Sequence, residues 1–365
     1  MNDSFWNRRR VMVTGATGFK GAWLCLWLQE LGADVLGYSL DPPTDPSLFE
    51  AAGVGAGMIS RIGDVRERED VRAALDEHRP EVVFHLAAQP LVRRSYVEPA
   101  ETFDVNVLGT VSVLEAVRAA DSVRSVVVVT TDKCYENHGD CWPMRESDPL
   151  GGHDPYSASK ACCELVVQAY RRSFFATTHV GLASARAGNV IGGGDWAEDR
   201  LVPDIERAIR RGGAVSVRFP EAVRPWQHVL EPLAGYLQLA ERLWAAPQQS
   251  SGAWNFGPPS EQGASVAECI DGYIGHRGAG RWIHDPPAVA VAEAAFLTLD
   301  SSKARRLLQW RSLLTLDEAL ALTAEWYRTA ETASQQQTLR RFTCGQIESY
   351  QTRRRTMAAP ARRAA

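Results

Sequence analysis

The chain has 365 residues, of which 45% are hydrophobic and 23% are charged, and its formal net charge is −4. This composition is ordinary for a globular protein and excludes a chain that is disordered throughout. Acidic and basic residues are spread along the sequence, which disfavours nucleic acid or a membrane surface as a partner, so we expect a small-molecule ligand.

Short apolar or β-branched runs alternate with helical segments in the first half of the sequence. We expect helices over 21–32 and 110–120, and strands over 11–15, 33–40, 58–64, 81–88, 125–131 and 179–187. This βαβ order predicts a parallel sheet, and the continuous apolar strands indicate that helices cover both of its faces. The predicted fold class is α/β, with a Rossmann-type doubly wound parallel sheet and a smaller C-terminal substrate-binding domain.

The pattern changes after about residue 188, where loops rich in Gly, Trp and Pro are interleaved with helices. We assign residues 1–188 to the nucleotide-binding domain, with segments at about 225–257 returning to it. Residues 189–345 are assigned mainly to the substrate-binding domain. Residues 346–365 are basic and poor in apolar side chains, so we expect a disordered, solvated tail.

A glycine-rich loop follows the first expected strand and leads directly into a helix. Its three glycines allow a tight turn, a close approach of the backbone to a pyrophosphate and close packing of the helix, whose N-terminal N–H groups attract the anion. The order of strand, loop and helix favours a dinucleotide site over a plain connection. The candidate cofactor residues of this loop are Gly15, Thr17, Gly18, Phe19, Lys20 and Gly21.

Residues that follow the next strands extend the cofactor site, because open α/β sheets bind ligands at the carboxyl ends of their strands. Asp41 follows the second strand, where an acid would accept hydrogen bonds from a ribose and repel a 2′-phosphate, which favours NAD over NADP. The alternative is that Asp41 only begins the turn before Pro42 and Pro43. Asp64 is a candidate for the adenine amino group. The further candidates are Val65, Leu86, Ala87, Ala88 and Thr130.

Tyr156 and Lys160 stand four residues apart, on one face of an expected helix. A phenol with a pKa of about 10 is a poor base at neutral pH, but a nearby ammonium and an oxidised nicotinamide both favour the tyrosinate. Tyr156 can then take the proton of a sugar hydroxyl while the sugar carbon gives a hydride to the cofactor. The alternative is a surface pair that arose by chance, which the preceding glycine-rich loop disfavours.

The fifth expected strand ends abruptly in Thr131, Asp132 and Lys133, without a Gly or Pro between them. An acid and a base side by side at the carboxyl end of a strand are candidates for proton transfer. The alternative is a pair of solvated loop residues.

These motifs together resemble the extended short-chain dehydrogenase/reductase family. The resemblance is carried by T-G-x-x-G-x-x-G, by the strand end L-A-A, by Asn106 in N-V-L-G-T and by Y-x-x-x-K, and it covers roughly residues 8–330. Within the family, the segments TTDKCYEN, DPYSASK and RPWQHVLEP are similar to the CDP-glucose 4,6-dehydratase branch, in which a lysine follows the active-site aspartate. The resemblance adds Asn106 to the cofactor candidates.

The resemblance implies a hydro-lyase of deoxysugar biosynthesis that recycles NAD. C4 of the CDP-glucose sugar is oxidised with Tyr156 as base, water is lost across C5 and C6, and hydride returns to C6. The resemblance assigns Thr131 to the C4 oxygen and Asp132 to the departing C6 hydroxyl, and burial on the apolar strand suits that acid. Lys133 either removes the C5 proton with a lowered pKa or stabilises the enolate as a cation.

The resemblance also implies a set of substrate contacts. These are Gln89, Asn189, Arg200 and Arg224. Asn189 and Arg224 are expected at the diphosphate, which suits a guanidinium, whereas Arg200 has the alternative of an exposed residue before a helix. Lys20 is expected near the cofactor or substrate phosphates, with a surface lysine as the alternative. Helices around 103–120 and 158–174 form dimer faces in this family, so we expect a homodimer, with a tetramer as the alternative.

Two rival functions follow from the same motifs. The first is another NAD-dependent nucleotide-sugar enzyme, either a 4-epimerase or a dehydratase for another nucleotide. An epimerase needs no acid beyond its tyrosine, so Asp132 and Lys133 favour a dehydratase. The second is a non-catalytic dinucleotide sensor on the same fold, which has no need of Tyr156 and Lys160.

The remaining sequence features concern location and metals. The N-terminal residues show no signal-peptide pattern, and no stretch approaches the ~18 apolar residues of a membrane-spanning helix. We therefore expect a cytoplasmic protein. The seven cysteines form no C-x-x-C pair, and the eight histidines show no ligand spacing, so we expect neither a disulfide framework nor a metal site.

Overall fold

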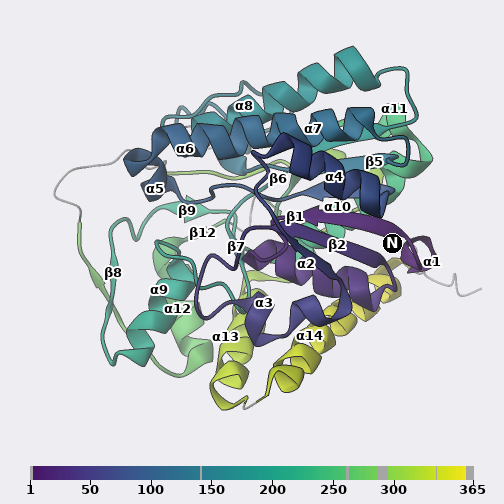
Figure 1. The fold of residues 1–365 in the computed structure, drawn as a ribbon. Coiled ribbons are helices and arrows are strands. Elements are labelled where there is room, and N and C mark those ends of the chain that lie inside the picture. The colour runs from purple at the N-terminus through teal and green to yellow at the C-terminus, as the bar shows by residue number, and fades with distance from the viewer. Residues whose placement is uncertain (1–2, 140–141, 260–262, 287–294, 334, 359–365) are drawn as a thin grey trace, which may run out of the picture.

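The computed structural model of the chain describes residues 3–139, 142–259, 263–286, 295–333 and 335–358. A seven-stranded sheet forms its centre, and every strand runs parallel to its neighbours (Figure 1). In spatial order the strands are β3 (Ile59–Ile62), β2 (Asp34–Ser39), β1 (Arg10–Thr14), β4 (Val82–His85), β5 (Ser125–Val129), β6 (Gly181–Ala187) and β11 (Gly252–Phe256). The predicted Rossmann-type sheet is confirmed. Its strand order reverses between β1 and β4, and such sheets bind ligands in the crevice outside this point.

Helices cover both faces of the sheet, as the continuous apolar strands predict. Alternate residues of a strand point to opposite faces, so Val127 and Val129 of β5 join one core cluster while Val126 and Val128 join another. Figure 1 shows α7 and α8 on one side of the sheet and α2 and α14 on the other. The covering helices are α2 (Phe19–Glu30), α4 (Arg68–His78), α7 (Gly109–Ala119), α8 (Pro155–Tyr170), α10 (Leu230–Ala245) and α14 (Gln336–Ala358). Each fully buried valine contributes about 1.5–3 kcal/mol relative to an exposed one.

Helix α2 is apolar on all sides because other elements enclose it on all sides. Every side chain from Ala22 to Leu28 is buried. The sheet lies on one side of α2, and α14 lies on the other, where Tyr350 packs edge-on against Trp27. A helix that is hydrophobic all round is typical of a buried element. The glycine-rich loop at its start is therefore attached to a firmly packed helix.

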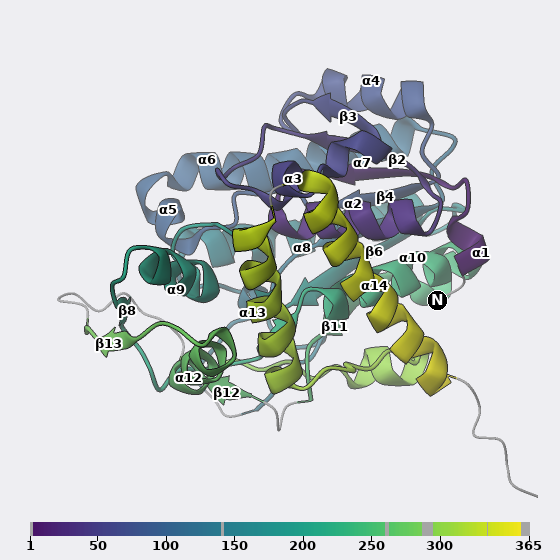
Figure 2. The same ribbon diagram turned by 90° about the horizontal axis from the view of Figure 1, so that it is seen from below.

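The C-terminal segment is helical, and the expectation of a solvated tail from residue 346 is wrong for the part that the structure describes. Figure 2 shows α14 crossing the molecule beside α13. Ile347 and Tyr350 are buried, and Tyr350 donates a hydrogen bond to Glu231 of α10 at 2.6 Å. Apolar residues recur at helical spacing along this segment, but the many arginines between them conceal the stripe. Residues 359–365 lie outside the described residues.

Short strand pairs and helices after β6 build the second part of the chain. β7 pairs with β10, β9 with β12 and β8 with β13, while β11 returns to the edge of the main sheet. The small strands are β7 (Val190–Ile191), β8 (Val215–Val217), β9 (Val223–Arg224), β10 (Gln227–His228), β12 (Ala264–Ser265) and β13 (Trp282–His284). The other helices are α1 (Asp3–Trp6), α3 (Leu48–Ala51), α5 (Val92–Val97), α6 (Pro99–Phe103), α9 (Leu201–Arg210), α11 (Pro247–Ser250), α12 (Val266–Arg277) and α13 (Leu316–Thr332), with short 3₁₀ or π turns at Val54–Gly57, Asp104–Leu108, Asp132–Cys134, Arg171–Phe175 and Ala304–Leu308. Within the described ranges, no helix combines the length and apolar character needed to cross a membrane.

Candidate active site

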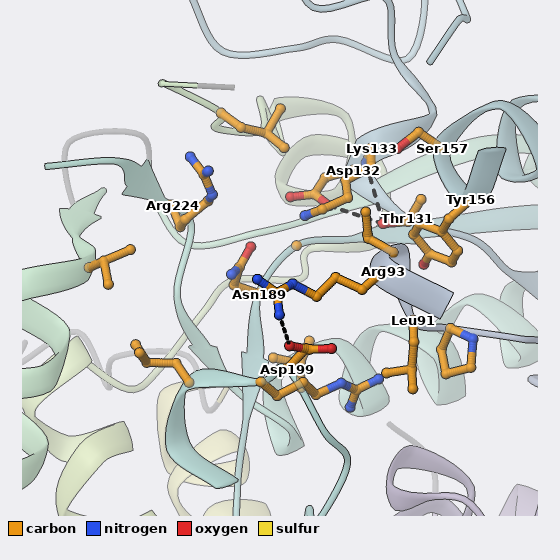
Figure 3. Close-up of a pocket in the computed structure, with 18 of the residues that line it drawn as sticks. Leu91, Arg93, Thr131, Asp132, Lys133, Tyr156, Ser157, Asn189, Asp199 and Arg224 are labelled. Carbon is orange, nitrogen blue, oxygen red and sulfur yellow. Dashed lines mark hydrogen bonds and ion pairs between the residues drawn. The ribbon is translucent and has the colours of Figure 1, made fainter. Parts of the chain in front are cut away.

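One cavity of about 870 Å³ opens beyond the carboxyl ends of β5 and β6, next to the start of α2 (Figure 3). Parallel strands all end at this edge, so the cavity collects residues that are far apart in the sequence. The predicted site residues that line it are Lys20, Thr130, Thr131, Asp132, Lys133, Tyr156, Asn189, Arg200 and Arg224. Its volume lies within the range of roughly 300–1,000 Å³ that is usual for small-molecule sites.

The turn after β5 presents a carboxylic acid to this cavity. A 3₁₀ turn begins at Asp132, and its N-cap Thr131 accepts the N–H of Lys133 at 3.3 Å. Thr131 also donates to Asp132 Oδ1 at 3.1 Å, whereas Asp132 Oδ2 is buried without a hydrogen-bond partner among the described residues. A Cβ on Gly188 would lie 2.6 Å from Oδ2, so the absence of a side chain there makes room for the acid. A buried carboxyl oxygen with a free hydrogen-bonding position is suited to give a proton to a ligand.

Helix α8 brings the predicted base, Tyr156, to the same cavity. Asp154 caps the helix with its side chain, so Tyr156 lies in the first turn, and Figure 3 shows it beside Thr131. Burial raises the pKa of Tyr156 to about 12, and a hydrogen bond with Thr131 partly opposes the rise. The cation that lowers this pKa most is Arg200, whereas we expected Lys160 to do so. The phenol therefore needs added positive charge nearby before it can act as a base at neutral pH.

Lys160 lies behind the cavity wall, where its Nζ donates to a main-chain carbonyl of β5 at 3.4 Å. Burial lowers the pKa of Lys160, and the negative charge of Glu164, one turn further along α8, opposes this shift. Glu164 accepts hydrogen bonds from Thr130 at 2.5 Å, Ser184 at 2.6 Å and Arg186 at 2.7 Å. The Glu164 and Arg186 side chains are each only 3% exposed. This buried ion pair joins the ends of β5 and β6 to α8, and it thereby positions Thr130.

The glycine-rich loop has the shape that a dinucleotide pyrophosphate requires. Gly15 has a left-handed φ of +72°, and a Cβ there would lie 2.7 Å from the backbone N of Ala87. A Cβ on Gly21 would lie 2.0 Å from the Gly15 carbonyl oxygen, so this contact also demands glycine. Gly18 is the N-cap of α2 and has no side chain to cap it, which leaves the first N–H groups of the helix for an anion. Thr17 ties the loop to the end of β2 by donating to a main-chain carbonyl at 2.9 Å.

The predicted ribose and adenine contacts lie along the same edge of the sheet. Asp41 is exposed just beyond β2, in a position open to a ligand. Asp64 accepts the Arg66 N–H at 2.9 Å and its guanidinium at 2.6 Å, and this hydrogen bonding lowers the pKa of Asp64. The adenine contact of Asp64 stays a prediction, with Arg66 as an additional group there. The predicted neighbours on the loop and at the ends of β3 and β4 are Phe19, Val65, Leu86, Ala87 and Ala88.

Two residues that we predicted as ligand contacts are hydrogen-bonded within the protein, and their ligand contacts stay predictions. Asn106 Oδ1 accepts the N–H of Gln89 at 2.8 Å, and Asn106 Nδ2 donates to Ser159 at 2.8 Å. The Gln89 side chain donates to Thr102 at 2.9 Å and does not line the cavity. Both amides are buried and hydrogen-bonded within the protein, and through Asn106 these bonds connect the segment after β4 to α8.

The structure adds charged cavity residues that no sequence motif singles out. Arg93 of α5 reaches across the cavity to Asp199 at 2.9 Å, as Figure 3 shows. Asp195 forms a second ion pair, at 2.9 Å, with Arg200. The sequence signal for Arg93 is weak, because an arginine on a short helix is commonly exposed. Asp195 and Asp199 lie in a loop whose path only the tertiary structure defines.

Comparison with known proteins agrees with this geometry. Residues 11–257 match the NAD dependent epimerase/dehydratase family. The chain belongs to this family. A CDP-glucose 4,6-dehydratase of Salmonella typhimurium is 49% identical over 334 residues, which cover 90% of this chain and 93% of the relative. A dTDP-glucose 4,6-dehydratase of Xanthomonas campestris is 28% identical over 345 residues, covering 88% and 93% of the two chains.

Solved structures of the NAD dependent epimerase/dehydratase type share the fold. A UDP-glucose 4-epimerase from Stenotrophomonas maltophila with bound NAD has a TM-score of 0.78 at 24% identity, covering 89% of this chain and 100% of that one. A dTDP-glucose 4,6-dehydratase from Bacillus anthracis in complex with NAD has a TM-score of 0.74 at 20% identity, covering 89% and 98%. Membership in this NAD dependent family confirms the predicted cofactor.

Proposed function

We propose that this chain converts CDP-glucose to CDP-4-dehydro-6-deoxyglucose and water, in deoxysugar biosynthesis. The substrate is supported by the relative that is 49% identical over 90% of the chain and is named for this activity. The observation that carries the reaction type is Asp132 Oδ2, which is buried beside the cavity that Tyr156 lines and has no hydrogen-bond partner in the described part of the chain. An epimerase needs no such acid next to its tyrosine.

The steps are assigned to residues that meet in the cavity. NAD, when bound, accepts a hydride from C4 and returns it to C6, so the net redox change is zero. Tyr156 takes the proton of the C4 hydroxyl, and Thr131, its hydrogen-bond partner, holds that oxygen. The C4 ketone acidifies the C5 proton, which a base in the cavity removes and which is given back to C5 when hydride adds to C6. Asp132 gives its proton to the C6 hydroxyl, which leaves as water while a double bond forms between C5 and C6.

Lys133 follows Asp132 on the same turn and lines the same cavity. Two roles are open to it, removal of the C5 proton as a neutral amine or stabilisation of the enolate as a cation. A Lys133→Met enzyme with C5-deuterated substrate separates the two roles. Loss of C5 exchange while C4 oxidation continues assigns the proton transfer to Lys133, and retained exchange assigns charge stabilisation.

The diphosphate of the substrate is assigned to the far side of the cavity. Asn189 and Arg224 line it there, and Asn189 Oδ1 is buried without a partner among the described residues. Arg200 lines the same cavity and interacts electrostatically with Tyr156. A guanidinium suits a diphosphate because its planar fork donates two parallel hydrogen bonds.

Turnover of a panel of nucleotide sugars tests the proposal. The purified enzyme with NAD is incubated with CDP-, UDP-, TDP- and GDP-glucose, and 4-keto-6-deoxy product is expected from CDP-glucose. Turnover of another sugar nucleotide alone would contradict the substrate, a 4-epimer as sole product would identify an epimerase, and binding of NAD without any turnover would identify a sensor.

Tyr156→Phe should abolish C4 oxidation. Asp132→Asn should oxidise C4 and then stall, with elimination slowed by about 10²–10⁴-fold.

We further propose a homodimer built on the outer helices. Large apolar side chains are exposed on the predicted dimer helices and the segments next to them: Val97, Leu108, Leu165 and Phe174. Exposed apolar side chains that gather into one patch typically mark a protein interface, and we infer that these four contribute to such a patch. Sedimentation of the purified protein at the mass of one chain would contradict the dimer. The cytoplasmic location stays a prediction from the sequence.

A further inference from the structure

The chain uses lysine in very few places. Of its 40 basic residues only four are lysines: Lys20, Lys133, Lys160 and Lys303. Lys20 and Lys133 line the cavity and Lys160 lies behind its wall, whereas Lys303 lies elsewhere and donates to a main-chain carbonyl of β11. An ammonium is a compact charge that can lose its proton when buried, whereas a guanidinium stays charged. Three of the four lysines therefore lie at the cavity, where a compact cation that can lose its proton differs chemically from an arginine.

Lys20 is the second residue of α2, half-buried, with an amine that forms no hydrogen bond or ion pair with any residue that the structure describes. The cations near it are Arg200 and Lys160. The carboxylates near it are Asp132 and Asp195. Asp195 is already paired with Arg200 at 2.9 Å. Burial, and after it the charge of Arg200, lowers the pKa of Lys20 to about 8.

We propose that Lys20 is a substrate-binding residue, whose ammonium contacts the sugar-linked phosphate of the nucleotide sugar together with Arg200. The inference rests on the proposed function, since it takes a nucleotide sugar as the ligand. Asn189 and Arg224 line the same cavity, so α2, the N-cap of α9, the loop after β6 and β9 each bring a polar side chain to one space, which is where the anion is assigned. Lys20 thus differs from the glycines around it, which act on the cofactor through their main chain.

The neighbouring charges explain why this cation is a lysine. Before an anion binds, Lys20 and Arg200 repel each other, and only the lysine can relieve the repulsion by losing its proton. The charge of a bound diphosphate favours the ammonium and raises the pKa of Lys20. Binding is therefore coupled to proton uptake. With a pKa of about 8 in the free enzyme, the neutral amine is more populated at about pH 8.5 than at about pH 7, so the uptake should grow with pH over this range.

Calorimetric titration measures this uptake directly. NAD-bound enzyme carrying Tyr156→Phe, which stops turnover, is titrated with CDP-glucose in two buffers of different ionisation enthalpy. The expected result is proton uptake that is larger at about pH 8.5 than at about pH 7. If CDP-glucose does not bind, the UDP-, TDP- or GDP-sugar that does bind replaces it. This substitution separates a wrong assignment of the nucleotide from a wrong role for Lys20, because all four nucleotide sugars carry the phosphate that Lys20 is proposed to contact.

Variants of the same enzyme show which residue takes up the proton when the substrate binds. Lys20→Arg keeps the charge and should abolish the uptake. Lys20→Met should abolish it too and weaken binding at about pH 7 by about tenfold to a hundredfold, the effect of losing a charge-assisted hydrogen bond. Lys303→Met is the matched control and should behave like the parent. No uptake in the parent, uptake that persists in Lys20→Arg, or unchanged affinity in Lys20→Met would each overturn the proposal.

Discussion

The buried ion pair between Glu164 and Arg186 is the contact at the site whose loss should cost the most stability. Glu164→Gln keeps the shape of the side chain and removes its charge. The new amide NH2 group would face donors, because Thr130, Ser184 and Arg186 all donate to the carboxylate at 2.5–2.7 Å. The guanidinium of Arg186, at 3% exposure, would keep its charge without its carboxylate partner. Removing one partner of a buried pair costs about 3–5 kcal/mol.

Urea unfolding of the parent and the variant measures this difference. Glu77→Gln is the matched control, because Glu77 pairs with Arg61 at 3.0 Å while its side chain is 80% exposed. An exposed pair of this kind contributes less than about 1 kcal/mol. If Glu164→Gln lowers the free energy of unfolding by no more than the control does, the reasoning that the pair anchors β5 and β6 to α8 is refuted.

Two further predictions use the same unfolding assay. Burial lowers the pKa of His85 and of His228 to about 3. Each histidine stays neutral in the folded protein but takes a proton in the unfolded chain below about pH 6.5. The free energy of unfolding should therefore be lower at about pH 5 than at about pH 7, by up to about 2 kcal/mol for each histidine. Equal free energies of unfolding at the two pH values would contradict this. Gly21→Ala should destabilise by about 1–3 kcal/mol or more, because its Cβ would lie 2.0 Å from a main-chain oxygen. At Gly345 in α14, an added Cβ would meet no atom within 4 Å in the described residues, apart from its chain neighbours and the nearby helix backbone. Gly345→Ala should therefore stabilise the protein by up to about 1 kcal/mol. If both glycine substitutions change the stability in the same direction, the comparison is refuted.

The local features of the molecule could be predicted from the sequence because they depend on neighbouring residues. Six of the seven strands of the main sheet follow from apolar runs, and the glycine spacing at residues 15, 18 and 21 follows from the backbone geometry of one loop. A parallel sheet then brings all its carboxyl ends to one edge. That rule is sufficient to place Thr131 and Asp132 at the edge where the glycine-rich loop lies, and the family resemblance adds Tyr156 to them.

Only the tertiary structure decided the contacts between distant segments. The internal hydrogen bonds of Gln89 and Asn106 depend on how the segment after β4, the turn at Asp104–Leu108 and α8 pack together, and the sequence around each amide does not report these bonds. The helical C-terminal segment was missed because its apolar stripe gains stability from packing on α2 and α10, which no local pattern reports. Lys20 is the clearest case: its position in the glycine-rich loop indicates the cofactor, but its surroundings are Arg200 and Asp132, which the fold brings to it from other strands and loops.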